Sequence, residues 1–210
     1  MPTPKQMQYE KAAQTVMKAL ARRRFTAEYC PTAKSAREAI LAQIAPDATV
    51  GWGGTLTMAQ LGVLDALRER KQPCFDRERS DETPEEVMHR CLNADVFLMS
   101  ANALTEDGCL VNLDGNGNRV AALIYGPKKV VVAVGMNKLC PNVEAAIERT
   151  RHIAAPMNAQ RFPGESPCRI TGVCADCTSP GCICSNLVIT RLCHRPGRIH
   201  IVLIGEDLGM

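Results

Sequence analysis

Five cysteines that fall within seventeen consecutive positions are the residues of this chain best suited to chemistry. They lie in the stretch SPCRITGVCADCTSPGCICSN, residues 166–186. Thiols this close together can form disulfides, bind a metal or take part in redox chemistry. The choice among these three largely decides what the protein does.

The disulfide interpretation has the least support. The chain contains eleven cysteines, an odd number that fits poorly with a full set of disulfides. Residues 1–25 have no apolar core of the kind found in signal peptides, and no stretch is long and apolar enough to span a membrane. We therefore expect a cytoplasmic protein without a membrane span, in a compartment where thiols stay reduced.

A bound metal or cluster is the better interpretation. One Cys-x-x-Cys pair with further thiols in the same loop can enclose a single ion or one cluster. Structural zinc sites often use two such pairs, whereas the spacing here is irregular beyond the first. The pattern favours a [4Fe–4S] cluster, with Zn2+ as the alternative. The cysteines concerned are Cys168, Cys174, Cys177, Cys182 and Cys184.

A glycine-rich turn at residues 50–62, VGWGGTLTMAQLG, is a candidate anion site. Gly53 and Gly54 follow an apolar run, and Thr55 or Thr57 begins the next helix. Glycine lets the backbone approach a ligand closely, and the free N–H groups at a helix start favour an anion. A tight strand-to-helix turn capped by threonine explains the same residues equally well.

A second polar block, TEDGCLVNLDGNGNRVA at residues 105–121, lies between two apolar runs. Glu106 and Asp107 are its candidate catalytic residues, and Glu106 is suited to act as a general base or a covalent carboxylate. The guanidinium of Arg119 is suited to hold a carboxylate or phosphate. Ordinary turn chemistry accounts for the turn residues taken singly. The candidate ligand-binding residues of this block are Asn112, Gly115, Asn118 and Arg119.

The elements that must position these residues alternate between helix and strand. Apolar runs predict the strands, and amphipathic periodicity or capping residues predict the helices. Near-continuous Val/Ile/Leu runs indicate a three-layer α/β fold with a mostly parallel sheet flanked by helices. The predicted strands are 25–30, 48–54, 95–104, 109–118 with its glycine turn, 128–135 and 198–209, and the predicted helices are 5–24, 32–44, 57–70, 83–93, 119–125 and 142–159.

Length and composition limit the classes of function. The chain length predicts a single domain, residues 1–210, in which residues 163–193 form a Cys-rich segment that binds the metal or cluster. The net charge is only +3 and 4% of residues are aromatic, which argues against nucleic-acid binding.

Three blocks of the sequence together resemble the lactate-utilisation (LUD) domain family: VGWGGTLTMAQLG, TEDGCLVNLDGNGNRVAALIYGPKKVVVAVGMNKL and AIERTRHIAAPMNAQR. The resemblance extends over nearly the whole chain. It implies the fold shared by ribose-5-phosphate isomerase, glucosamine-phosphate deaminase and the CoA transferases, with a ligand cleft at strand ends. It further implies that Gly53, Gly54, Thr55 and Thr57 form one wall of this cleft, with Glu106, Asp107, Asn112 and Asn118 near it.

The cysteine segment has its own resemblance within that family. Some LUD proteins carry a C-terminal segment similar to PCxxTGxCxDCxSPxxIC. Matched to this sequence, it implies Cys168, Cys174, Cys177 and Cys184 as the four ligands of a cluster. Cys182 stands where the pattern is open, and its exchange with Cys184 is kept as an alternative.

The resemblance also implies a metabolic role, because LUD proteins are linked to oxidation of lactate to pyruvate, often beside iron–sulfur partner proteins. We expect an iron–sulfur-binding redox accessory protein with a cleft for a small anionic metabolite, either a carboxylate or a phosphate. It would act with a redox partner protein, and a homo-oligomer is compatible with the sequence. Two alternatives stay open. One is an isomerase or acyl/CoA-transfer-type enzyme that uses Glu106, with a structural zinc or cluster, and the other is a non-catalytic metabolite or redox sensor.

Overall fold

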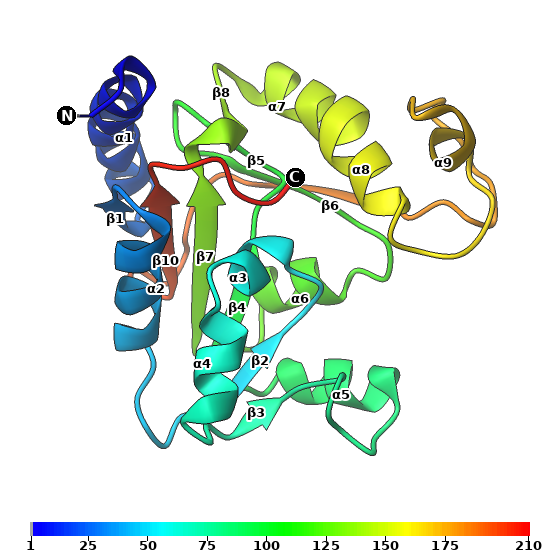
Figure 1. Cartoon of the computed structure of the whole chain (residues 1–210), viewed down its shortest axis with the longest axis horizontal. Helices are drawn as coiled ribbons and strands as arrows, with labels where there is room; N and C mark the ends of the chain where they lie inside the picture. The colour runs from blue at the N-terminus through cyan, green and yellow to red at the C-terminus, as the bar shows by residue number, and fades with distance from the viewer. Residues whose placement is uncertain (1) are drawn as a thin grey trace.

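The chain folds around a six-stranded, fully parallel β-sheet with helices on both of its faces (Figure 1). The structure is a computed structural model that describes residues 2–210. The strand order is β1-β10-β7-β4-β2-β3, and the predicted three-layer α/β fold is confirmed. The strands are β1 (Thr26–Cys30), β2 (Val50–Trp52), β3 (Cys74–Phe75), β4 (Val96–Ser100), β7 (Lys129–Gly135) and β10 (Ile199–Ile204).

The central strands are apolar along almost their whole length because helices cover both faces of the sheet. Every residue of β4 and β10 is buried. Successive side chains of β4 alternate between two cores, with Phe97 and Met99 in one and Val96 and Leu98 in the other. This double burial is what a parallel sheet requires, and it explains the unbroken Val/Ile/Leu runs of the sequence.

Six helices form the two outer layers of this sheet. One core receives side chains from α1 (Pro4–Arg22), α5 (Pro84–Cys91) and α6 (Asn118–Ile124), and the other from α2 (Ala33–Ala42), α3 (Leu56–Gln60) and α4 (Val63–Glu69). Thr3, Thr32 and Thr83 each begin a helix with a reciprocal capping box. Within residues 2–210, no helix combines the length and the apolar character needed to cross a membrane.

A second, four-stranded sheet lies beside the first and carries the cysteine segment. Its order is β8-β5-β6-β9, formed by β8 (Leu139–Cys140), β5 (Ala103–Thr105), β6 (Leu110–Asp114) and β9 (Asn186–Thr190). The edge strand β9 begins two residues after Cys184 and pairs antiparallel with β6, with Leu187 opposite Leu113. The cysteine segment is therefore anchored to the sheet on its C-terminal side.

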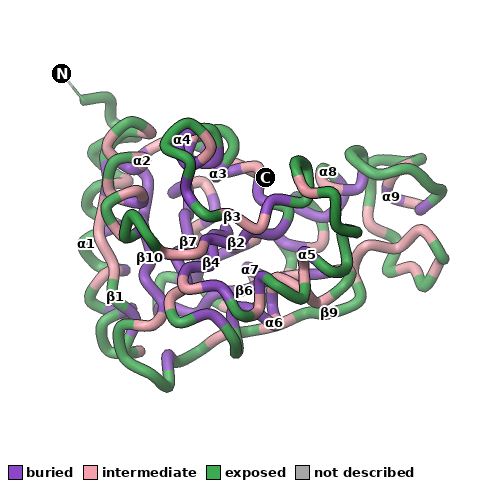
Figure 2. The backbone as a smooth tube through the Cα atoms, turned by 90° about the horizontal axis from the view of Figure 1, so that it is seen from below, coloured by how far each residue is buried: buried purple, intermediate pink, exposed green. Residues whose placement is uncertain are grey.

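The helical layer over this second sheet is one long segment with a π-helical turn in its middle. It consists of α7 (Val143–Arg149), the π turn η2 (Thr150–Ala154) and α8 (Ala155–Ala159), in place of the single helix predicted over 142–159. Such turns are uncommon and are frequently found at functional sites. After it, α9 (Pro167–Thr171) and the cysteine loop project from the sheets, and most of their residues are exposed or half-buried (Figure 2).

Two of the predicted elements are divided in the structure. The helix predicted over 57–70 breaks into α3 and α4 at Gly62, whose positive φ of 66° places it in the left-handed region. The strand predicted over 95–104 is two strands, because β4 belongs to the first sheet and β5 to the second. The short strands β3, β8 and β9 and the helix α9 were not predicted from the sequence.

Replacing Gly126 by alanine is expected to destabilise the fold. Gly126 follows α6 with φ at +115°, and a Cβ atom there would lie 2.5 Å from the backbone oxygen of Leu92. Gly197 is the matched control, because its φ is +82° and nothing lies within 4 Å of its Cβ position. Urea unfolding should show Gly126→Ala to be about 1 kcal/mol less stable than Gly197→Ala. Equal stability of the two variants would contradict the close approach to Leu92.

Candidate functional site

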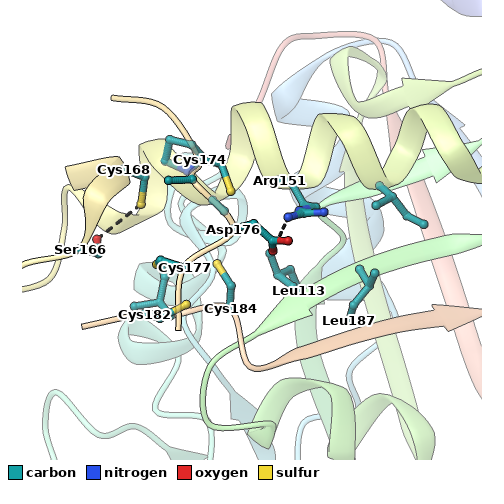
Figure 3. A pocket seen from close by; sticks show the side chains of 15 residues that line it. Leu113, Arg151, Ser166, Cys168, Cys174, Asp176, Cys177, Cys182, Cys184 and Leu187 are labelled. Atoms are coloured by element: carbon teal, nitrogen blue, oxygen red, sulfur yellow. Dashed lines mark hydrogen bonds and ion pairs between the residues drawn. The ribbon is translucent and has the colours of Figure 1, made fainter. Parts of the chain in front are cut away.

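All five cysteines of residues 166–186 line one cavity of about 230 Å³ (Figure 3). Cys168 comes from α9, and the other four come from the loop between α9 and β9. The opposite wall is formed by side chains of β6, β9 and the α7–α8 helical segment, among them Leu113, Leu187 and Arg151. The structure therefore brings together Cys168, Cys174, Cys177, Cys182 and Cys184.

Proline and glycine residues give the cysteine loop its local shape. Pro167 starts α9, and Gly172 ends it in a left-handed conformation from which its N–H donates to the Cys168 carbonyl. At Gly181, a Cβ atom would lie 2.8 Å from the Glu165 backbone oxygen, so only glycine permits that approach. These residues fold a short loop back over the cavity.

The thiols lie close enough to one another to affect their protonation. The Cys184 thiol has a pKa raised to about 12, first because the half-buried thiol is partly desolvated and then because Cys182, Cys168 and Cys174 lie near it. The Ser179 hydroxyl, 3.4 Å from the Cys177 sulfur, lowers the pKa of the Cys177 thiol. Both Cys182 and Cys184 line the cavity, so position alone does not separate the two.

An ion pair between Arg151 and Asp176 lies at the cavity wall (Figure 3). Arg151 stands on the π turn η2, and Asp176 stands between Cys174 and Cys177. Asp176 has a φ of 49°, a left-handed conformation that is uncommon for residues other than glycine. The guanidinium of Arg151 also interacts with Cys174, and it brings a permanent positive charge to groups that become anionic when they bind a metal.

A second, smaller depression lies where β2 and β4 end, at the carboxyl edge of the first sheet. Its volume is about 50 Å³. In open parallel α/β sheets, ligands bind at this edge. The lining residues are Gly54, Thr55, Leu56, Thr57, Ser100, Ala101, Asn102, Arg119, Lys138, Arg161, Gly209 and Met210.

The most buried charged side chain of this depression is Lys138, which is only 2% exposed. Its ammonium group donates to Ser100 Oγ at 2.9 Å, to Thr57 Oγ1 at 3.1 Å and to the Ala101 carbonyl oxygen at 3.3 Å. None of the ion pairs within residues 2–210 includes Lys138. Burial, together with the nearby charges of Arg149 and Arg119, lowers the pKa of Lys138 to about 7.

The surroundings of this lysine are basic. Arg119 and Arg161 line the depression, and within residues 2–210 no aspartate or glutamate does so, although Arg119 Nε pairs with the buried Asp114 at 3.5 Å. The Nη2 atom of Arg77 lies 3.6 Å from the position that a Cβ atom on Gly54 would occupy. Several positive charges around a small volume favour an anionic ligand.

Most of the residues predicted for the first glycine turn lie at this depression. Gly54, Thr55 and Thr57 line it, and Thr55 caps α3 by accepting from the Met58 N–H. Gly53 packs against the side chains of Asn118 and Arg119, so a Cβ atom there would overlap Arg119. The structure thus joins the first glycine turn to the end of the second polar block.

The other residues of that block lie elsewhere. Asp107 forms an ion pair with Arg23 and accepts from Thr105, and Gly108 beside it packs on the backbone of α1. Neither Glu106 nor Asp107 lines the depression, because the β5–β6 turn that carries both points towards α1. The structure therefore does not bring these two carboxylates into the depression with the glycine turn, and their catalytic role stays a prediction.

Asn112 and Gly115 occupy two further positions. The side chain of Asn112 is fully buried on β6, and neither its amide nitrogen nor its oxygen has a hydrogen-bond partner within the protein. It does not line either of the two sites. Gly115 packs on the backbone of Ile183, with the Ile183 oxygen 3.3 Å from its Cβ position, and so supports the cysteine loop.

Lys138, Ser100 and Arg161 belong to the depression and were not singled out from the sequence. One signal was present, because Lys138 follows the apolar strand β7 and the short helix η1 (Met136–Lys138) at the edge where ligands bind. The burial of its side chain depends on contacts with residues 38 and 81 positions away, which no local pattern reveals.

The two sites are neighbours through strand β6. Arg119, which lines the depression, donates from Nη2 to the Leu113 carbonyl oxygen at 2.7 Å. The Leu113 side chain lines the cysteine cavity. Leu113 of β6 therefore contacts both sites. The sequence alone did not show whether the two sites are adjacent.

Known proteins share this architecture. The sequence profile of the LUD domain matches residues 13–204, and no curated protein matches the sequence significantly. Among solved structures, the fold is similar to that of a DUF162 family protein from Deinococcus radiodurans, with a TM-score of 0.55 and 13% identity over 97% of this chain and 99% of that one. Because the LUD profile extends over nearly all of the sequence, this chain belongs to the LUD domain family.

Proposed function

We propose that this protein binds an iron–sulfur cluster and acts as a redox accessory in lactate or other hydroxy-acid utilisation. The observation that carries the proposal is that five cysteines surround a single cavity. Thiolates are the ligands that hold iron–sulfur clusters, and a bound cluster supplies one-electron transfer. We propose Cys168, Cys174, Cys177 and Cys184 as its ligands, with Cys182 as the alternative to Cys184.

The arrangement of the thiols favours a cluster over a zinc ion. Zinc bonds each thiolate at about 2.3 Å, so its four ligands must converge on one point. The five thiols instead lie around a volume of about 230 Å³, which suits a group of several atoms.

Features around the cavity support electron exchange with a partner protein. The cavity wall opposite the cysteines is largely apolar, with Leu113, Ile147 and Leu187. Exposed apolar side chains on and beside the enclosing elements η2, α8 and α9 are of the kind that marks protein–protein contacts. They are Ile153, Met157, Phe162, Ile170 and Val173.

The basic depression supports the second part of the proposal, a cleft for a small anionic metabolite. Lys138 and Arg119 place positive charge beside the glycine turn, and no acidic side chain lines the site. A volume of about 50 Å³ has room for a few water-sized groups. A short carboxylic acid, or the anionic end of a larger molecule, fits these conditions.

Metal analysis of protein purified without oxygen tests the cluster. We expect about four iron and four sulfide per chain and a brown colour that dithionite bleaches. Tight binding of one zinc per chain without sulfide would contradict the cluster and indicate a structural zinc site.

Replacing Gly53 by alanine is expected to weaken anion binding, because the added Cβ atom overlaps the side chain of Arg119 and displaces it. Gly197→Ala is the matched control, since Gly197 does not line the depression and nothing lies within 4 Å of its Cβ position. With inorganic phosphate or lactate as probe, the thermal shift should give a dissociation constant raised about tenfold for Gly53→Ala alone. An unchanged dissociation constant would show that Arg119 does not contribute to anion binding.

A further inference from the structure

The amine of Lys138 stands in an environment that differs from that of a structural lysine. Its three partners, Ser100, Thr57 and the Ala101 carbonyl, are neutral. A buried ammonium group without a carboxylate partner is costly, so buried lysines are normally paired with an acid. The charges that act on it are the positive groups of Arg149 and Arg119. Desolvation and cationic neighbours are the two conditions that turn a lysine into a nucleophilic amine.

We propose that Lys138 is a catalytic nucleophile that condenses with the carbonyl carbon of a small 2-oxo acid bound in the basic depression. The inference rests on the proposed anion cleft but not on the cluster. A 2-oxo acid has both groups that the site can recognise. Its carboxylate can bind the guanidinium side chains, and its adjacent carbonyl carbon can react with the amine.

The lining of the depression orients such a ligand. Arg119 and Arg161 line the same small volume as Lys138 and can hold a carboxylate. A volume of about 50 Å³ leaves space for a ligand of only a few atoms beside the amine. With the carboxylate on a guanidinium, the neighbouring carbonyl carbon is the part of the ligand left for Lys138.

Two hydroxyl groups are placed to move the protons of the condensation. Ser100 Oγ and Thr57 Oγ1 lie 3.2 Å apart, and both contact the Lys138 nitrogen. The amine lone pair forms the new C–N bond, and the carbonyl oxygen takes up a proton through these hydroxyls to give a carbinolamine. The C–O bond then breaks, water leaves with a second proton, and a C=N bond remains. One amine and one carbonyl give one imine and one water, with no net oxidation or reduction.

Reductive trapping tests this assignment on the full-length protein. The protein is incubated with pyruvate and cyanoborohydride, digested, and each lysine-containing peptide is examined by mass spectrometry. We expect a stable secondary amine on Lys138, at least about tenfold more abundant than on any exposed lysine. Lys138→Met should lose this adduct, and lactate, which has no carbonyl, should give none.

Lys129 provides the internal control. It lies at the other end of β7, is partly buried with a lowered pKa, and donates to Gln43 instead of facing the depression. Lys129→Met should leave the Lys138 adduct unchanged. Equal labelling of Lys129 and Lys138 would overturn the proposal, because the reaction would then not depend on the site.

A parallel thermal-shift measurement separates this inference from the anion cleft. If pyruvate and lactate both raise the melting temperature but nothing is trapped, Lys138 is not a nucleophile and the cleft still stands. If neither compound binds and nothing is trapped, both the nucleophile and the cleft for short carboxylic acids are overturned. Trapping with retained binding of both compounds supports both.

Discussion

Replacing Cys168, Cys174 or Cys177 by alanine is expected to abolish the iron and sulfide that we propose the chain binds. Each of these thiols lines the shared cavity, and a cluster with four thiolate ligands does not keep its full occupancy when one is removed. The measurement is iron and sulfide per chain in protein purified without oxygen, alongside the visible spectrum. Full iron content in any of the three variants would exclude that cysteine as a ligand.

Cys193→Ala is the matched control for these variants. Cys193 is buried and lies after β9 in the chain, but it does not line the cavity, and its sulfur contacts the Arg195 carbonyl oxygen. Its replacement should leave the iron content unchanged. Circular dichroism of every variant would separate loss of the cluster from loss of the fold.

The fourth ligand is decided by a pair of variants. Cys184→Ala should lose the cluster, and Cys182→Ala should keep it. The opposite result would assign Cys182 as the ligand. Iron retained in both single variants and lost in the double variant would mean that the two thiols substitute for each other.

Lys138→Met is expected to remove a pH dependence of stability worth about 3 kcal/mol between pH 7 and pH 9.5. The pKa of Lys138 is about 7 in the folded protein, against an ordinary value of 10.5. Between these two values the unfolded chain binds a proton at this lysine and the folded protein does not. The free energy of unfolding of the wild-type protein therefore rises with pH across this window.

The comparison of wild type and variant isolates this lysine from the other titrating groups. The charged neighbours Arg149 and Arg119, and the Cys140 thiol beside the Lys138 carbonyl, are present in both proteins. Urea unfolding at several pH values should show the wild type gaining stability relative to Lys138→Met as the pH rises. A constant difference between the two proteins would mean that Lys138 has an ordinary pKa and a counter-charge.

The fold could be predicted because its signals are local. The apolar runs of β4, β7 and β10, the amphipathic pattern of α1 and the threonine caps of α2 and α5 identify their elements without knowledge of the rest of the chain. The grouping of the cysteines could be predicted equally well, since all five thiols lie within one short segment. Strand β9 gave a weaker signal, because it is a five-residue edge strand with mostly exposed or half-buried side chains.

The anion site could be predicted only in part because its members come from distant segments. The glycine turn at Gly53 and Gly54 is a local sequence pattern. Arg119 could be predicted because it follows a second glycine-containing turn. Lys138 becomes exceptional only when α3 and β4 bury it, and Glu106 loses its expected place only when the β5–β6 turn packs on α1. Both facts depend on tertiary contacts.

The pairing of β9 with β6 affects the order in which parts of the protein unfold. Asn112 of β6 pairs with Val188 of β9, so forming this edge of the second sheet also fixes the C-terminal end of the cysteine loop. A group bound to several cysteines shortens that loop and reduces the entropy lost on closing it. Without such a group, the amide protons of β9 should exchange with solvent by local fraying, while those of β7 and β10 exchange only when the whole protein unfolds.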